Sequence, residues 1–182
     1  MRVTLLRTPW LVMAGAILLF TNAGVSPAQN THVGWKVVWK GYSFPEDGFA
    51  ITLPDAPRKH PDKNIANATT YSVNINPDYA VTVRVIPDPR DCSTVLAQLR
   101  DGVVNQKAQE ADPASLREMA LGGHPGLEYE WKVSDQRVGL IRYYCNAGRV
   151  YALAANREKT QPLMPDARRI LDSFRLLEPG AK

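Results

Sequence analysis

The first half of the chain contains several short segments in which apolar and polar residues alternate, followed by one segment with helical spacing. Residues 49–53 alternate large apolar side chains with small or polar ones, which is typical of a half-buried strand. Residues 71–75 and 79–86 repeat this pattern on either side of an Asn-Pro-Asp turn, so they predict a β-hairpin. Residues 95–103 then carry apolar side chains at every fourth position, which predicts an amphipathic helix of about four turns.

The second half returns to a strand pattern and ends in a helical one. Residues 116–121 are strand-like but also suit a helix, and residues 127–133 alternate clearly. The next two segments, 138–145 and 149–155, are separated by a three-residue turn that ends in glycine. Both are apolar on each face, so we expect them at the centre of a sheet that is covered on both sides. Residues 163–174 have helical spacing.

This order of elements predicts an α+β fold, in which helices pack on an antiparallel β-sheet. Asp91 or Ser93 is expected to cap the long helix by accepting a backbone N–H bond. With 182 residues, 45% hydrophobic and 22% charged, the chain has the composition of an ordinary globular protein. We expect one domain over residues 29–182, whose ends, 29–34 and 178–182, fray.

The N-terminus has the pattern of an export signal. Arg2 and Arg7 precede an uncharged apolar run over residues 10–20, and Ser26 and Ala28 supply the small side chains that a signal peptidase reads. We therefore predict that residues 1–28 are a cleaved signal peptide, with a retained membrane anchor as the alternative. The apolar run is shorter than the ~20 residues that span a bilayer. The mature protein is then exported, to a periplasm or to the extracellular space, with no membrane span.

The predicted export affects how the net charge and the two cysteines are interpreted. Loss of two arginines with the signal lowers the formal net charge from +4 to +2, which argues against nucleic-acid binding. The densest cationic cluster, residues 58–63, lies between prolines and predicts a solvated loop. Cys92 and Cys145 are the only cysteines, and in an oxidising compartment they are expected to form a structural disulfide. Two separately buried thiols are the alternative.

Four stretches carry a resemblance to a known family. Residues 39–54, Trp-Lys-Gly-Tyr-Ser-Phe-Pro-Glu-Asp-Gly-Phe-Ala-Ile-Thr-Leu-Pro, resemble the opening of PsbP-like domains. Residues 121–129 resemble the middle strand of these domains, and residues 148–153 and 170–174 resemble their closing pattern. The resemblance implies an antiparallel sheet with helices on both faces, an α/β/α sandwich. The resemblance implies a fold shared by plant PsbP proteins, Ran-binding Mog proteins and DcrB-like exported bacterial proteins. Proteins with this fold are mostly non-enzymatic binding or assembly proteins.

No catalytic or metal-binding motif stands out. His32, His60 and His124 lack the spacing of metal ligands, and no nucleophile motif or phosphate-binding glycine loop is present. Glu128 and Glu130 share one strand face, but Lys132 continues it, so we interpret this face as a solvated charged stripe. We therefore expect no catalytic, metal or cofactor site and no enzymatic activity.

The distribution of aromatic residues allows an alternative function, the binding of a small ligand. They gather on the last three strands, where alternation buries most of them. A minority would suit an aromatic-lined pocket of a small-ligand carrier or an enzyme.

The main prediction for function is a non-catalytic exported domain that binds or helps to assemble a protein partner. Trp35 and Trp39 lie four residues apart, on one face if this segment is a strand. Trp39 adjoins the family-like stretch and is expected in the core. Trp35 is either buried with it or exposed as a contact for the partner, since tryptophan is enriched at binding hot spots.

Overall fold

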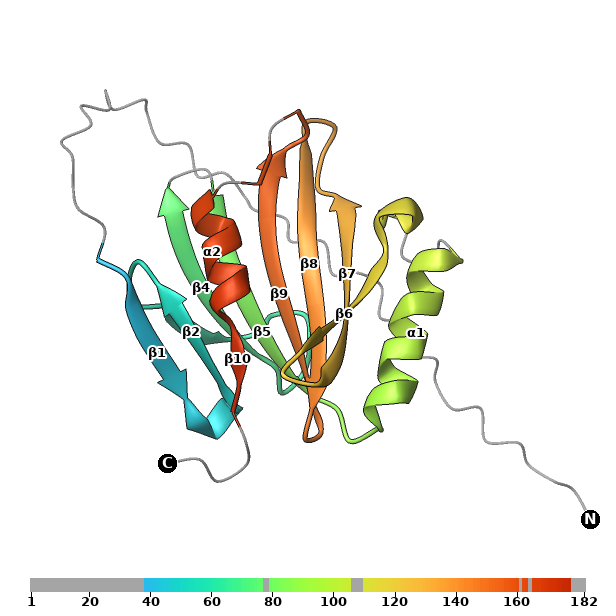
Figure 1. Ribbon diagram of the computed structural model, residues 1–182, viewed down its shortest axis with the longest axis horizontal. Coiled ribbons are helices and arrows are strands. Elements are labelled where there is room, and N and C mark those ends of the chain that lie inside the picture. The colour runs from blue at the N-terminus through green and yellow to red at the C-terminus, as the bar shows by residue number, and fades with distance from the viewer. Residues whose placement is uncertain (1–37, 77–78, 106–109, 161, 164, 178–182) are drawn as a thin grey trace, which may run out of the picture.

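The computed structural model describes residues 38–76, 79–105, 110–160, 162–163 and 165–177. Within them the chain forms two antiparallel β-sheets and two α-helices (Figure 1). The larger sheet has seven strands in the order β3-β4-β5-β9-β8-β7-β6. In that order the strands are Arg58–Pro61, Thr69–Asn76, Tyr79–Pro87, Arg149–Glu158, Arg137–Asn146, His124–Lys132 and Arg117–Leu121.

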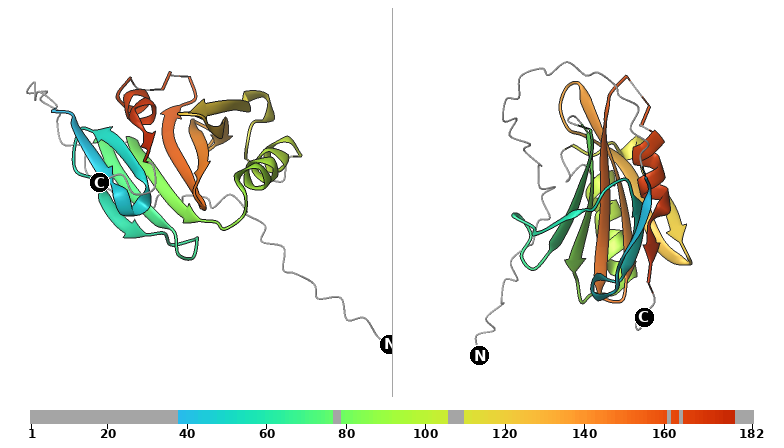
Figure 2. Two further views of the ribbon diagram at one scale, coloured as in Figure 1. Left: turned by 60° about the horizontal axis from the view of Figure 1, so that its bottom comes forward. Right: turned by 90° about the vertical axis from the view of Figure 1, so that its left-hand side faces the viewer.

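The smaller sheet and the helices cover parts of the larger sheet. Its three strands, β1 (Lys40–Phe44), β2 (Phe49–Leu53) and β10 (Arg175–Leu176), pair in the order β1-β2-β10. This sheet and α2 (Pro165–Ser173) lie together on one side of the larger sheet (Figure 2). The longer helix, α1 (Cys92–Val104), lies at the opposite end of the molecule from β1 (Figure 1). Short 3-10 helices span Pro45–Asp47 and Pro113–Ser115.

The main hydrophobic core lies between the larger sheet and the layer formed by the smaller sheet and α2. Alternate residues of β5, such as Val83, point into it, as do Phe49 of β2, Ile170 of α2 and Phe174 between α2 and β10. On the other face of the larger sheet, α1 packs through Val95 and other apolar residues against β5, β7, β8 and β9. Helices therefore lie on both faces of the sheet, as predicted, and the α+β fold class is confirmed.

The turn between β1 and β2 shows how the smaller sheet is held on the larger one. Gly48 has a φ of 75°, a conformation that glycine adopts without strain. The hydroxyl group of Tyr151 on β9 donates a hydrogen bond to the carbonyl oxygen of Asp47. A Cβ atom at position 48 would lie 2.7 Å from that hydroxyl oxygen, so the turn approaches β9 too closely for a side chain.

Three sequence predictions about the elements of the fold need correction. Residues 58–61 of the predicted solvated loop form the edge strand β3, and Lys59 makes ion pairs with Glu46 and Asp47. The β8–β9 turn has two residues and not three. Finally, β8 and β9 are central, but helix α1 covers only one end of their outer face. The first strand of the described residues begins at Lys40, and residues 35–37 of the segment around Trp35 lie outside the described residues.

Candidate functional site

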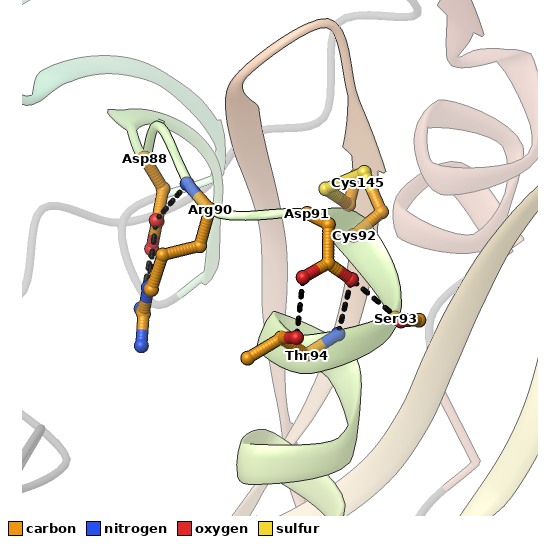
Figure 3. The surroundings of a disulfide bond; sticks show 7 residues. All are labelled: Asp88, Arg90, Asp91, Cys92, Ser93, Thr94 and Cys145. Carbon is orange, nitrogen blue, oxygen red and sulfur yellow. Dashed lines mark hydrogen bonds and ion pairs between the residues drawn. A yellow bond between two sulfur atoms is a disulfide. The ribbon is translucent and has the colours of Figure 1, made fainter.

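The predicted disulfide joins α1 to the end of β8 (Figure 3). Cys92 and Cys145 are bonded, with their Cα atoms 5.4 Å apart, so the predicted pairing is confirmed. Cys145 is buried beneath α1, whereas Cys92 is partly exposed at the first position of the helix. The bond closes a loop of 53 residues and fixes the N-terminus of α1 on the sheet.

Two carboxylates next to the disulfide have structural partners. Asp91 caps α1, as the sequence predicted, because its side chain accepts a 2.8 Å bond from the backbone N–H of Thr94. Asp88 is buried and accepts bonds from the side chain and the backbone N–H of Arg90. The bonds from Arg90 hold the pKa of Asp88 below its ordinary value, although burial opposes this. In the part of the chain described here, no group of three or more potential ligands lies close enough together to hold a metal ion.

A network of charged residues with a buried centre links α2 to β6, β7 and β8. Glu128 on β7 is only 2% exposed and accepts a 2.5 Å bond from Nε of Arg142 on β8. Its other oxygen accepts a bond from Arg117 on β6. Arg142 also donates a 2.7 Å bond to Asp172 on α2. Four side chains of alternating charge therefore tie the helix to the edge of the sheet.

This network corrects the interpretation of Glu128 as part of a solvated stripe. Burial alone favours the neutral form of Arg142, but the bonds to Glu128 and Asp172 outweigh it and raise its pKa. Glu130 is more exposed and pairs with Arg157. The sequence did indicate a buried ion pair, because Arg142 lies in an otherwise apolar strand and a buried charge requires a partner. It did not identify that partner.

Helix α1, together with Ile65 and Ala68 of the β3–β4 loop, packs on one end of the outer face of the larger sheet, and among the described residues no helix lies over the rest of this face. One row of side chains crosses the four central strands β4, β5, β9 and β8 on this face. In that order the residues are Ser72, Thr82, Ala154 and Ile141, and all four are half-buried. None of them is ionisable. We call this surface the open sheet face. Its charged neighbours are Arg58 on β3, Arg84 on β5, which pairs with Asp62, and Arg137, which pairs with Glu158 at the ends of β8 and β9.

Aromatic side chains border the open sheet face on the side of β7. The indole ring of Trp131 lies against Gly139, so closely that a Cβ atom there would be 2.2 Å from the ring. Tyr129 and Tyr143 stack with ring centroids 6.0 Å apart, and burial raises the pKa of both hydroxyl groups. The aromatic residues of the last strands are therefore divided between the two faces, since Tyr144 and Tyr151 point into the main core.

A cavity of about 10 Å³ lies between the two sheets. Phe44, Leu53, Pro57, Tyr71 and Val73 are among its apolar lining residues. Its volume is about that of one water-sized sphere. It brings no polar groups together, so it does not favour the alternative of a ligand carrier or an enzyme.

The remaining predictions concern the N-terminal segment and the histidines. The signal peptide, His32 and Trp35 lie outside the described residues. Trp39 is half-buried against the core, and the guanidinium carbon of Arg169 lies 4.0 Å from its ring centroid. His60 is exposed on the edge strand β3, and His124 begins β7, next to the opposite edge of the larger sheet. Among the described residues, no helix is long and apolar enough to cross a membrane.

Comparison with known proteins identifies the fold. No family model and no curated protein matches the sequence. The structure is similar to the solution structure of cyanobacterial PsbP (CyanoP) from Synechocystis sp. PCC 6803, with a TM-score of 0.52 and 15% identity over 83% of this chain and 99% of CyanoP. The chain has the PsbP-like fold.

A second solved structure is also similar to this chain. It is a crystal structure of a protein from Bacteroides thetaiotaomicron VPI-5482, with a TM-score of 0.52 and 9% identity over 79% of this chain and 50% of that one. LpqN, described as involved in cell envelope biogenesis of Mycobacterium tuberculosis, matches 71% of this chain and 83% of its own at a TM-score of 0.44 and 18% identity. At 15% and 9% identity, the likeness to the first two structures concerns the fold alone. The resemblance to Mog and DcrB-like proteins stays a prediction.

Proposed function

We propose that this PsbP-like domain is an exported, non-catalytic domain that binds a protein partner through its open sheet face. The observation that carries the proposal is the charge pattern of this face. Solvated faces of antiparallel sheets usually carry polar and charged side chains. Here the four side chains Ser72, Thr82, Ala154 and Ile141 form an uncharged row, and the nearest charged side chains of the central strands, Arg84 and Arg137, are paired with Asp62 and Glu158.

This arrangement resembles the organisation of protein interfaces, which have a core depleted of charge and a polar rim. Trp131 at the border supplies the kind of aromatic side chain that is enriched at such interfaces. The partner that fits this surface is a protein that presents an uncharged, largely apolar surface of its own. A partner with a strongly charged surface would lose solvation there without gaining ion pairs.

A lysine at the centre of the open sheet face should block this interaction. Ala154→Lys places a charge on the face, whereas Ala97→Lys places the same side chain on the exposed surface of α1. The partner is first captured by cross-linking in the host and identified, and its affinity for each purified variant is then measured by calorimetry. We expect Ala154→Lys to weaken binding at least about ten-fold, or 1.4 kcal/mol, and Ala97→Lys to leave it unchanged. Equal affinities for both variants would contradict the proposal.

Trp35 is proposed as an additional partner contact. Trp35→Ala should weaken binding of a protein partner with little effect on stability, because an exposed anchor contributes mainly to the complex. Trp39→Ala is the matched comparison, since Trp39 packs against the core and should cost about 2 kcal/mol of stability when truncated. Thermal melts and calorimetry of both variants separate the two roles. Unfolding of the domain by Trp35→Ala, or unchanged binding, would exclude a contact role for Trp35.

A further inference from the structure

A cationic surface lies on the side of the molecule opposite the open sheet face. It consists of Trp39 and Lys40 at the start of β1, together with Arg168 and Arg169 of α2; we call it the α2 patch. The guanidinium group of Arg169 stacks over the indole ring of Trp39, which joins the two elements into one surface. Lys40, Arg168 and Arg169 are all exposed to solvent.

Among the described residues the cations of the α2 patch, Lys40, Arg168 and Arg169, form no ion pairs with neighbouring carboxylates, although Asp166 lies on the same helix one turn before Arg169. Asp172 lies on the same helix, but it bonds to Arg142. This distinguishes the patch from the cluster around Lys59, whose charge is paired with Glu46 and Asp47.

An exposed apolar residue adjoins these charges. Val38 directly precedes Trp39 and is 60% exposed, one of two large hydrophobic side chains with such exposure among the described residues. Arginine, lysine and tryptophan next to exposed aliphatic side chains match the chemistry of a membrane interface, where cations meet lipid phosphates and indole rings lie at the headgroup level. An acidic protein surface would be recognised by the cations without needing Val38.

We propose that the α2 patch binds the surface of a membrane that contains anionic phospholipids. The position of the patch in the chain supports this occupant. The segment that carries the apolar run of residues 10–20 enters the fold at Val38, beside the patch. The open sheet face lies on the opposite side of the larger sheet, so a membrane at the patch leaves that face free for a protein partner.

The proposal is tested with vesicles of phosphatidylcholine, with and without phosphatidylglycerol, and with the protein as purified from the exported compartment. Arg168→Gln/Arg169→Gln removes two cations of the patch. Arg58→Gln/Lys63→Gln removes two exposed cations from β3 and the loop after it, and so matches the change in net charge. Both variants keep the same N-terminus, so any contribution of the leader to vesicle binding is the same in each.

We expect the patch variant to bind anionic vesicles about 25-fold more weakly, about five-fold for each arginine. The β3 variant should change much less, and Arg168→Lys/Arg169→Lys should retain most of the binding because it keeps the charge. Added salt should release the protein by screening these interactions. Equal losses in the two Gln variants, or equal binding to vesicles without phosphatidylglycerol, would overturn the proposal. Equally tight binding of soluble polyglutamate would overturn it in favour of an acidic protein partner.

Discussion

Replacing Glu128 with glutamine tests how much the buried charge network contributes to stability. Glu128 is 2% exposed and bonds to Arg142, which is 7% exposed. Without the carboxylate, Arg142 keeps only Asp172 as an acidic partner, and the side chain of Asp172 is 54% exposed. Removing one partner of a buried ion pair typically costs about 3–5 kcal/mol, a large part of the free energy of unfolding of a small domain. Since glutamine retains one acceptor oxygen, we expect about 3 kcal/mol.

Glu130→Gln is the matched control for this prediction. Glu130 lies two residues further along the same face of β7 and pairs with Arg157, but the two side chains are 31% and 20% exposed. Its loss should cost at most about 1 kcal/mol, as for other solvent-accessible pairs. Urea unfolding of the oxidised proteins, followed by circular dichroism, measures both. At a slope of about 2 kcal/mol per M, the Glu128 variant should unfold about 1.5 M earlier than the unsubstituted protein.

A double variant checks the cause of the loss. In Glu128→Gln/Arg142→Met no uncompensated buried charge remains, so part of the lost stability should return. The exposed groups of Arg117 and Asp172 can be solvated by water, because their side chains are 66% and 54% exposed. The reasoning is refuted if Glu128→Gln and Glu130→Gln shift the midpoint equally, or if the double variant is less stable than Glu128→Gln.

Three further predictions follow from the disulfide, the pKa of Asp88 and the packing of Gly139. Reducing the disulfide should lower the free energy of unfolding by up to about 4 kcal/mol, because it opens a 53-residue loop; identical thermal melts with and without reductant would contradict this. Asp88→Asn should destabilise the protein at neutral pH. Because Arg90 lowers the pKa of Asp88, this contribution is present above about pH 4 and is lost as the pH falls through the folded-state value. Urea titrations should therefore show the variant approaching the unsubstituted protein in acid, whereas a widening gap is the opposite outcome. Gly139→Ala should cost about 1–3 kcal/mol, because its methyl group would meet the ring of Trp131; in urea unfolding, adding Trp131→Ala should remove most of this penalty, and purely additive effects would show that the ring is not the obstacle.

The sequence by itself determined the features that depend on neighbouring residues. Alternation over residues 49–53 and 79–86 predicted strands, because side chains of a strand point to opposite faces at a fixed period. The cap of α1 at Asp91 was also predictable, because a capping side chain bonds to a backbone N–H of its own helix, a few residues away. The pairing of Cys92 with Cys145 followed from their number and the expected compartment.

Only the tertiary structure decided which face of each strand is covered. Glu128 and Glu130 have the same place in the alternating pattern, yet Glu128 is buried, because Arg142 and Arg117 on the neighbouring strands enclose it. The smaller sheet depends on β10, whose two residues are too few to show a period and pair with β2 from more than 100 positions away. The open sheet face likewise arises because α1 packs on one end of the sheet, and among the described residues no helix lies over the other end of that face. Contacts between distant segments determine these features, and local periodicity contains no information about them.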